Sequence, residues 1–129
     1  MQYSENPSDD VQIKAFLSGK SEHTLNLFHY FINEFQKIGN IELHPTKTMI
    51  ALGNPDKRIA WVTQLGKNFI HVVFPFKQLY PDNFCFKKTG QVLGSNQFNH
   101  HFRMLLKDDV NEEVVKFMQL AYYNEQPVA

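Results

Sequence analysis

The stretch KNFIHVVFPF, residues 67–76, decides the fold, because its apolar residues lie on both faces of a strand. Successive side chains of a strand point to opposite faces, so Phe69 and Val73 oppose Ile70 and Phe74. A strand that is apolar on both sides is typical of the middle of a sheet, with cover on both faces. The sequence therefore predicts a sheet with this segment at its centre.

Alternating segments flank this central strand. IELHPTKTMIALG (41–53) and KRIAWVTQLG (57–66) precede it, and each ends at a glycine. NFCF (83–86) is counted as an additional short strand before a loop at 87–97, and FNHHFRMLL (98–106) follows as the last strand. Because closely connected strands are mostly antiparallel, we expect an antiparallel sheet of about five strands.

Three helices are predicted around the sheet, two before it and one after it. The second helix has apolar residues at helical spacing, Ser21 as its N-cap and Gly39 in the left-handed position that ends it. The last helix begins with Asp109 and Glu112 at capping-box spacing. Together these elements predict a single α+β domain over residues 1–129, with the helices on one face and residues 1–8 as a flexible tail.

Charge is distributed unevenly along a chain whose formal net charge is zero. Residues 43–107 hold nine basic and two acidic residues, a balance of +7, and the two flanks together carry −7. Such a split favours a surface that receives anions. The alternative is that most of these lysines lie in solvated turns, such as NPDK (54–57) and FKKTG (86–90).

Compartment and membrane signals point to a cytoplasmic protein. Cys85 is the single cysteine, so no internal disulfide forms. The first ten residues lack the basic start and apolar run of a signal peptide. No apolar run approaches the roughly 20 residues that cross a bilayer, so we expect no membrane contact.

The adjacent histidines in NHHFRM (99–104) raise the question of a metal site. In a strand His100 and His101 point to opposite faces, so the pair does not chelate one metal. A site that combines His44, His71 and His101 across the sheet stays open, although no HxxxH, HxH or CxxC spacing supports it. We therefore expect no metal and no cofactor.

Catalytic signatures are also missing from the sequence. No GxSxG elbow, P-loop or GxGxxG is present. Cys85 lies between phenylalanines and is interpreted as half-buried, although Lys87 and Lys88 favour a lowered pKa. These observations favour a non-enzymatic protein without deciding the matter.

The best candidate site is a set of residues from several strands. A sheet face that carries cations and aromatic residues binds nucleobases or anionic ligands. The candidate members, which come from four of the predicted strands, are Lys47, Trp61, His71, His101 and Arg103. The alternative is that Trp61 is core, that Lys47 extends its head to water and that Arg103 pairs with Glu42 or another acid.

Several segments resemble the bacterial family called domain of unknown function 5655. The similarity extends from about Phe16 to Tyr123 and is carried by residues 17–35, HPTKTMIAL (44–52), NHHFRM (99–104) and residues 106–122. The resemblance implies a compact α+β module without an established reaction, and some members are labelled predicted transport proteins. By position, the family's lysine-threonine pair corresponds to Lys47 and Thr48, and its histidine before the last helix to His101 or His100. Neither position carries a known role.

Three functional hypotheses follow. The leading one is a non-catalytic binding or accessory module whose basic, aromatic sheet face takes an unknown anionic small molecule or a protein partner. Nucleic acid is a conceivable anion, but no motif supports it. The second hypothesis is a protein-interaction module or homodimer built from excess apolar strand surface, and the chain is then a dimer rather than a monomer. The third is a metal carrier or cryptic enzyme that uses the sheet histidines.

Overall fold

The computed structural model describes residues 6–81 and 83–126, which form three helices and six strands. Two helices come first, α1 (Pro7–Leu17) and α2 (Glu22–Ile38). The strands follow in the order β1 (Glu42–Pro45), β2 (Ile50–Gly53), β3 (Arg58–Leu65), β4 (Ile70–Phe76), β5 (Lys88–Gln91) and β6 (Phe98–Met104). A short 3-10 turn, η1 (Lys107–Asp109), leads into α3 (Glu112–Tyr122).

All strand pairs are antiparallel, and the sheet order is β1-β2-β3-β4-β6-β5. The predicted α+β class and antiparallel sheet are thereby confirmed, with six strands instead of about five. β4 lies inside the sheet between β3 and β6, as predicted from its two-sided apolar pattern.

The extra strand arises because the predicted strand at 41–53 is a hairpin. The chain turns at residues 46–49, where the backbone N–H of Thr46 donates to the carbonyl of Met49 at 2.8 Å. The Thr46 hydroxyl adds a hydrogen bond to the same carbonyl, 3.0 Å. Lys47 therefore lies exposed in this turn, and its predicted place inside a strand is wrong.

A second difference lies before β6. Residues 83–86 are not a strand, because the Asn83 side-chain amide donates to the carbonyls of Tyr80 and Pro81 and holds the backbone in a turn. The strand is β5, within the predicted loop 87–97. It is anchored to β6 by the residue just before it, because the Lys87 N–H donates to the carbonyl of His101 at 2.8 Å.

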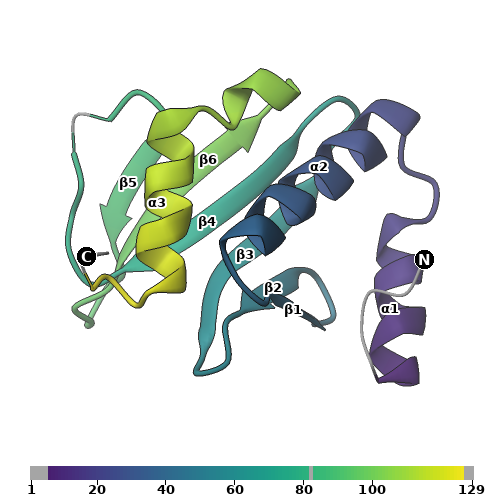
Figure 1. Cartoon of the computed structure of the whole chain (residues 1–129), viewed down its shortest axis with the longest axis horizontal. Coiled ribbons are helices and arrows are strands. Elements are labelled where there is room, and N and C mark those ends of the chain that lie inside the picture. The colour runs from purple at the N-terminus through teal and green to yellow at the C-terminus, as the bar shows by residue number, and fades with distance from the viewer. Residues whose placement is uncertain (1–5, 82, 127–129) are drawn as a thin grey trace.

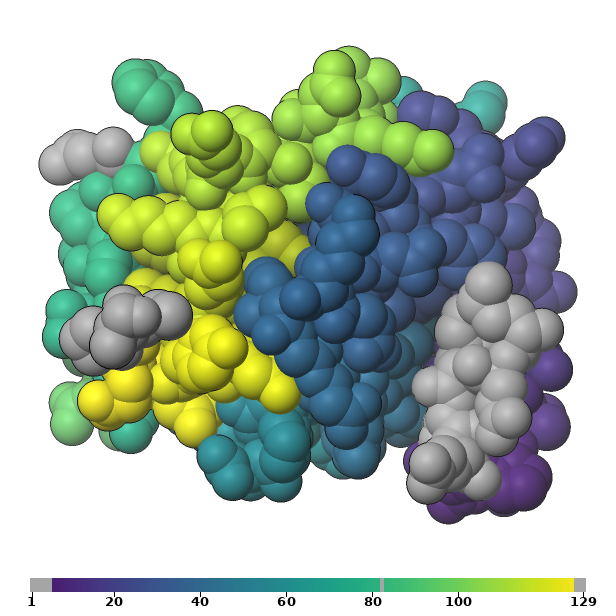
Figure 2. Space-filling model, viewed as in Figure 1, coloured from purple at the N-terminus to yellow at the C-terminus, as the bar shows by residue number. Residues whose placement is uncertain are grey.

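Helices α2 and α3 lie side by side over one face of the sheet, and α1 packs near β1 at its edge (Figure 1). The same view in space-filling form shows α2 and α3 closing over the strands behind them (Figure 2). Under these helices lies a core rich in phenylalanine, whose fully buried members are Phe28, Phe31, Phe35, Phe74, Phe76 and Phe102. We call the opposite face of the sheet the open face, because no helix in the described part of the chain lies on it. Cover by a second layer, predicted for the central strand, is therefore wrong.

The ends of α2 and α3 refine the sequence-based expectations. Ser21 caps α2 as predicted, since its side chain accepts from the Thr24 N–H. Gly39, however, has an extended backbone with φ 177°, and a Cβ there would lie 2.2 Å from the Tyr122 ring. Close approach of this ring, rather than a left-handed turn, explains the glycine.

The predicted capping box of the last helix is also replaced. Asn111 is the N-cap of α3, and its side chain accepts from the Val114 N–H at 3.0 Å. The Asp109 carboxylate instead accepts from the backbone N–H groups of Leu105 and Leu106.

The predicted N-terminal tail of residues 1–8 extends too far, because α1 begins at Pro7. Residues 1–5 of that tail lie outside the described residues. Within 6–81 and 83–126, no helix has the length and apolar character needed to cross a membrane.

Candidate anion-binding site on the open sheet face

The register of the sheet brings three candidate side chains, His71, His101 and Arg103, onto the open face together with Lys88. In the β4–β6 pair, His71 lies opposite Arg103 and Val73 lies opposite His101. In the β5–β6 pair, Lys88 lies opposite His101. Because strand side chains alternate, these residues point away from the helices, whereas His100 points into the core.

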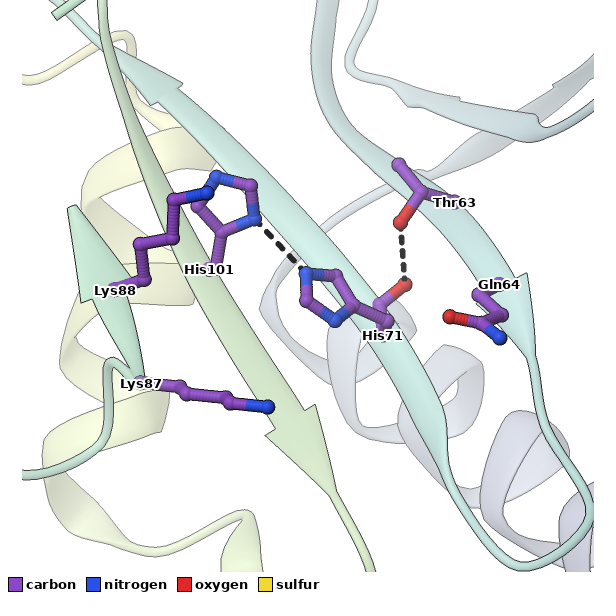
Figure 3. Close-up of a pocket in the computed structure, with 6 residues that line it drawn as sticks. All are labelled: Thr63, Gln64, His71, Lys87, Lys88 and His101. Atoms are coloured by element: carbon purple, nitrogen blue, oxygen red, sulfur yellow. Dashed lines mark hydrogen bonds between the residues drawn. The ribbon is translucent and has the colours of Figure 1, made fainter. Parts of the chain in front are cut away.

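His71 and His101 form an imidazole pair. Nε2 of His71 and Nδ1 of His101 are 2.9 Å apart and share one hydrogen bond (Figure 3). Burial is the largest cause that lowers the pKa of His71, followed by the neighbouring imidazole and the surrounding cations. Burial, followed by the charge of Lys88, lowers the pKa of His101. Both rings are therefore neutral at pH 7.

The imidazole pair lines an open pocket of about 400 Å³. Its other lining residues are Thr63 and Gln64 from β3, and Lys87 and Lys88 from the β5 side. The two lysines extend toward the imidazoles (Figure 3). No acidic residue is among the six residues that line this pocket, so its charged groups are all positive.

Arg103 adds a third cation beside the pair. Its guanidinium carbon lies 4.3 Å from the centre of the Phe69 ring, a cation–π contact. That ring rests over Gly66, where a Cβ would meet it at 2.2 Å. The Nε of Arg103 is buried and has no hydrogen-bond partner among the described residues.

The predicted alternative for Arg103, an ion pair with Glu42, is wrong. Glu42 lies on β1 and approaches His44, with Oε2 and Nε2 3.6 Å apart. Within residues 6–81 and 83–126, no carboxylate lies within ion-pair distance of Arg103, Lys87 or Lys88.

The remaining candidates stand apart from this cluster. Trp61 is half-buried on the open face, opposite Val73, with the Arg58 guanidinium carbon 5.7 Å from its ring centre. It does not line the pocket. Lys47, in the β1–β2 turn, lies beyond β2 and does not join the cluster.

The structure also separates His44 from the other two histidines of the metal hypothesis, which pair with each other. His44, Ala51, Trp61, Val73 and His101 are successive cross-strand neighbours. His44 is thus four strand spacings, about 19 Å, from His101. Among the residues that the structure describes, no group of three or more His, Cys, Asp or Glu side chains is placed to hold a metal ion.

Cys85 is not an activated nucleophile. Burial raises the pKa of the Cys85 thiol to about 12, and the carboxylate of Glu113 adds to the shift. The backbone N–H of Cys85 donates to Glu113 Oε1 at 2.7 Å. The nearby acid, which comes from α3, outweighs the sequence neighbours Lys87 and Lys88 that favoured a lowered pKa.

Four residues of the pocket were missed by sequence reasoning: Thr63, Gln64, Lys87 and Lys88. The two lysines were interpreted as turn residues, because KKTG looks like a loop. The positive balance of residues 43–107 was the available signal, but it does not say which lysines converge. That depends on the pairing of β5 with β6, which no local pattern reveals.

No known protein-family model matches this chain, and no curated protein or solved structure matches it either. The resemblance to domain of unknown function 5655 therefore stays a prediction.

Proposed function

We propose that the chain is a binding module that takes an anionic ligand on the open sheet face. Five side chains would hold the ligand, and we call them the basic cluster: His71, Lys87, Lys88, His101 and Arg103. The single observation that carries the proposal is the convergence of two pocket lysines and the adjacent Arg103 around a neutral imidazole pair, with no carboxylate among the pocket's lining residues.

Electrostatics supports this proposal. Like charges that lie close together repel each other, and after burial and the neighbouring imidazole, the positive charges near His71 also lower its pKa. On most protein surfaces, acidic side chains close to the cations offset such repulsion. Among the described residues, none of the ion pairs involves Lys87, Lys88 or Arg103. An anion in the pocket would remove the repulsion and supply an acceptor to the donors around it.

The test is an NMR titration of the whole protein with sulfate at low ionic strength. We expect saturable shifts of the His71 and His101 ring signals and of backbone amides in β4 and β6. Lys88→Gln or Arg103→Gln should weaken binding about tenfold, because each removes a charged contact worth roughly 1.4 kcal/mol or more. Lys116→Gln, the same change on the outer side of α3, is the matched control and should leave the affinity unchanged.

Added sodium chloride should also weaken the binding, because counterions screen the cluster. Wild-type protein that shows no saturable shift with sulfate would contradict the proposal. So would equal losses of affinity in Lys116→Gln and Lys88→Gln.

A second candidate function is homodimerisation, which a different observation favours. The apolar side chains of β4 are already used inside the chain, so they do not provide the predicted dimer surface. Phe84 and Leu93 are instead fully exposed on either side of the edge strand β5. Exposed edges flanked by apolar residues pair readily with a second strand.

Light scattering over a range of protein concentrations tests this candidate. A dimer that dissociates in the double variant Phe84→Ser, Leu93→Ser would support it. Val11→Ser, at an exposed apolar position on α1, is the control and should leave the mass unchanged. A wild-type monomer at all concentrations would exclude it.

A further inference from the structure

We infer that the ligand of the basic cluster is a doubly charged oxyanion of the phosphate-monoester type, and that the His71–His101 pair takes up one proton as it binds. This inference rests on the proposed function, and it names the chemical class of the ligand and the linkage that accompanies binding.

The hydrogen count of the imidazole pair is the first step. Two neutral imidazoles carry two N–H groups between them. One of these hydrogens occupies the shared bond between His71 Nε2 and His101 Nδ1. The other must lie on the outer nitrogen of the ring that accepts the shared bond. The neutral pair therefore presents one outer donor and one bare outer acceptor, and a bare acceptor repels an anion.

One added proton removes this mismatch. It converts the bare outer nitrogen to a donor and leaves the shared bond intact, so the pair gains a positive charge and two outward N–H groups. A second proton would place hydrogens on both inner nitrogens, which are 2.9 Å apart, and would break the shared bond. The pair is thus built to take up one proton and not two.

The groups that face the pair oppose this proton until an anion arrives. Lys87 and Lys88 face it from the β5 side, and Arg103 from β6. β3 contributes only the neutral Thr63 and Gln64. His100 lies behind the sheet, on the helix-covered face, where burial lowers its pKa, so it supplies no charge that favours the proton. No acid is among these neighbours, so the negative charge that favours the proton must come from the ligand.

The charge and size of the pocket indicate the ligand class. Two lysines in the pocket, Arg103 beside it and a protonated pair exceed what a carboxylate or a phosphodiester neutralises, since each of these anions carries a single charge. A phosphate monoester is largely dianionic near pH 7 and offers three acceptor oxygens. The pocket volume of about 400 Å³ lies within the range of small-molecule sites, roughly 300–1,000 Å³. It leaves space for an organic group on the phosphate.

Isothermal titration calorimetry at pH 6.5 tests the inference on the full chain. Sulfate is the main probe, because it remains a dianion and any proton uptake comes from the protein. Titrations in two cationic buffers of different ionisation enthalpy give the number of protons taken up. We expect about half to one proton per sulfate, and an affinity that rises as the pH falls, by up to about tenfold per pH unit.

Variants and other anions complete the experiment. The double variant His71→Gln, His101→Gln should bind sulfate more weakly and without proton uptake, because no imidazole is left beside the pocket to take up the proton. His44→Gln, on the same face but four strands away, should keep wild-type affinity and uptake. Phenyl phosphate at pH 7.5 should bind at least tenfold more tightly than acetate or dimethyl phosphate.

The outcomes separate this inference from the proposed function. Sulfate binding without proton uptake, or with uptake that persists in the double variant His71→Gln, His101→Gln, would overturn the inference and leave anion binding intact. Equal affinities for phenyl phosphate and dimethyl phosphate would overturn the ligand class and favour phosphodiesters. Failure of the wild type to bind any of these anions would overturn the proposed function itself.

Discussion

Two adjacent histidines, His100 and His101, lie on opposite faces of the sheet and have different kinds of hydrogen-bond partner. On the helix-covered face His100 is fully buried, with Nδ1–H donating to the Phe98 carbonyl at 2.9 Å and Nε2 accepting from the Tyr80 N–H at 3.0 Å. On the open face His101 bonds to the side chain of His71. The backbone partners of His100 do not gain or lose protons near neutral pH. The ring nitrogens of the imidazole pair do, so the hydrogens of this pair can change places. A buried histidine with fixed partners stabilises a fold, and one with a titratable partner responds to its surroundings.

The substitution His100→Ala should have the largest effect on this comparison. It removes the hydrogen bond from the Tyr80 N–H and the one to the Phe98 carbonyl, and it opens a cavity among the rings of Phe76 and Phe86, both 5.1 Å from the imidazole. We expect a loss of about 3–5 kcal/mol in the free energy of unfolding, measured by urea denaturation. His101→Ala, one residue away on the open face, should lose about 1 kcal/mol or less. Equal losses at the two positions would show that the faces do not differ.

The pH dependence of stability is the second test. Burial lowers the pKa of His100 and also of His71 and His101. Below pH about 6.5 the unfolded chain therefore binds protons that the native chain does not, so stability falls as the pH falls. Each histidine contributes at most about 1.4 kcal/mol per pH unit.

Sulfate should separate the two faces in this pH experiment. Because the pair takes up one proton when the anion binds, saturating sulfate removes the contribution of one of the two open-face histidines and leaves that of the other and of His100. We expect urea denaturation between pH 7.5 and 5.5 to show a shallower but non-zero slope with sulfate. A slope that sulfate does not change would contradict the coupling between the anion and the open face.

The support beneath Arg103 provides a third, smaller effect. A Cβ at Gly66 would lie 2.2 Å from the Phe69 ring, so Gly66→Ala should displace the ring on which the guanidinium rests. We expect the sulfate affinity to fall about three- to tenfold, the equivalent of roughly 1 kcal/mol of lost cation–π contact and positioning. Gly90→Ala in β5 is the matched control, because its Cβ meets nothing within 4 Å. Retention of wild-type affinity in Gly66→Ala would show that Phe69 does not position Arg103.

Sequence reasoning succeeded where a single element carries the signal. The two-sided apolar pattern of residues 67–76 placed β4 inside the sheet, and strand alternation separated His100 from His101. It failed where the result depends on distant parts of the chain. Gly39 is explained by Tyr122, 83 residues later, and the convergence of Lys88 with His101 depends on β5 pairing outside β6. Neither relation leaves a periodic or motif signal, because the partners come from different elements.

At Lys47 the sequence-based prediction and the structure differ most directly. Its substitution should have the smallest effect on sulfate affinity. Sequence analysis placed it in the candidate site, but it lies in the turn between β1 and β2 and Lys88 takes the position opposite His101. Lys47→Gln should therefore change the sulfate affinity less than twofold at moderate salt, because exposed charges separated by more than the Debye length of about 8–10 Å are screened. Lys88→Gln, the same chemical change, should reduce the affinity about tenfold. Comparable losses for the two variants in parallel calorimetric titrations would mean that the whole positive segment attracts the anion, and that the cluster around the imidazole pair is not a defined site.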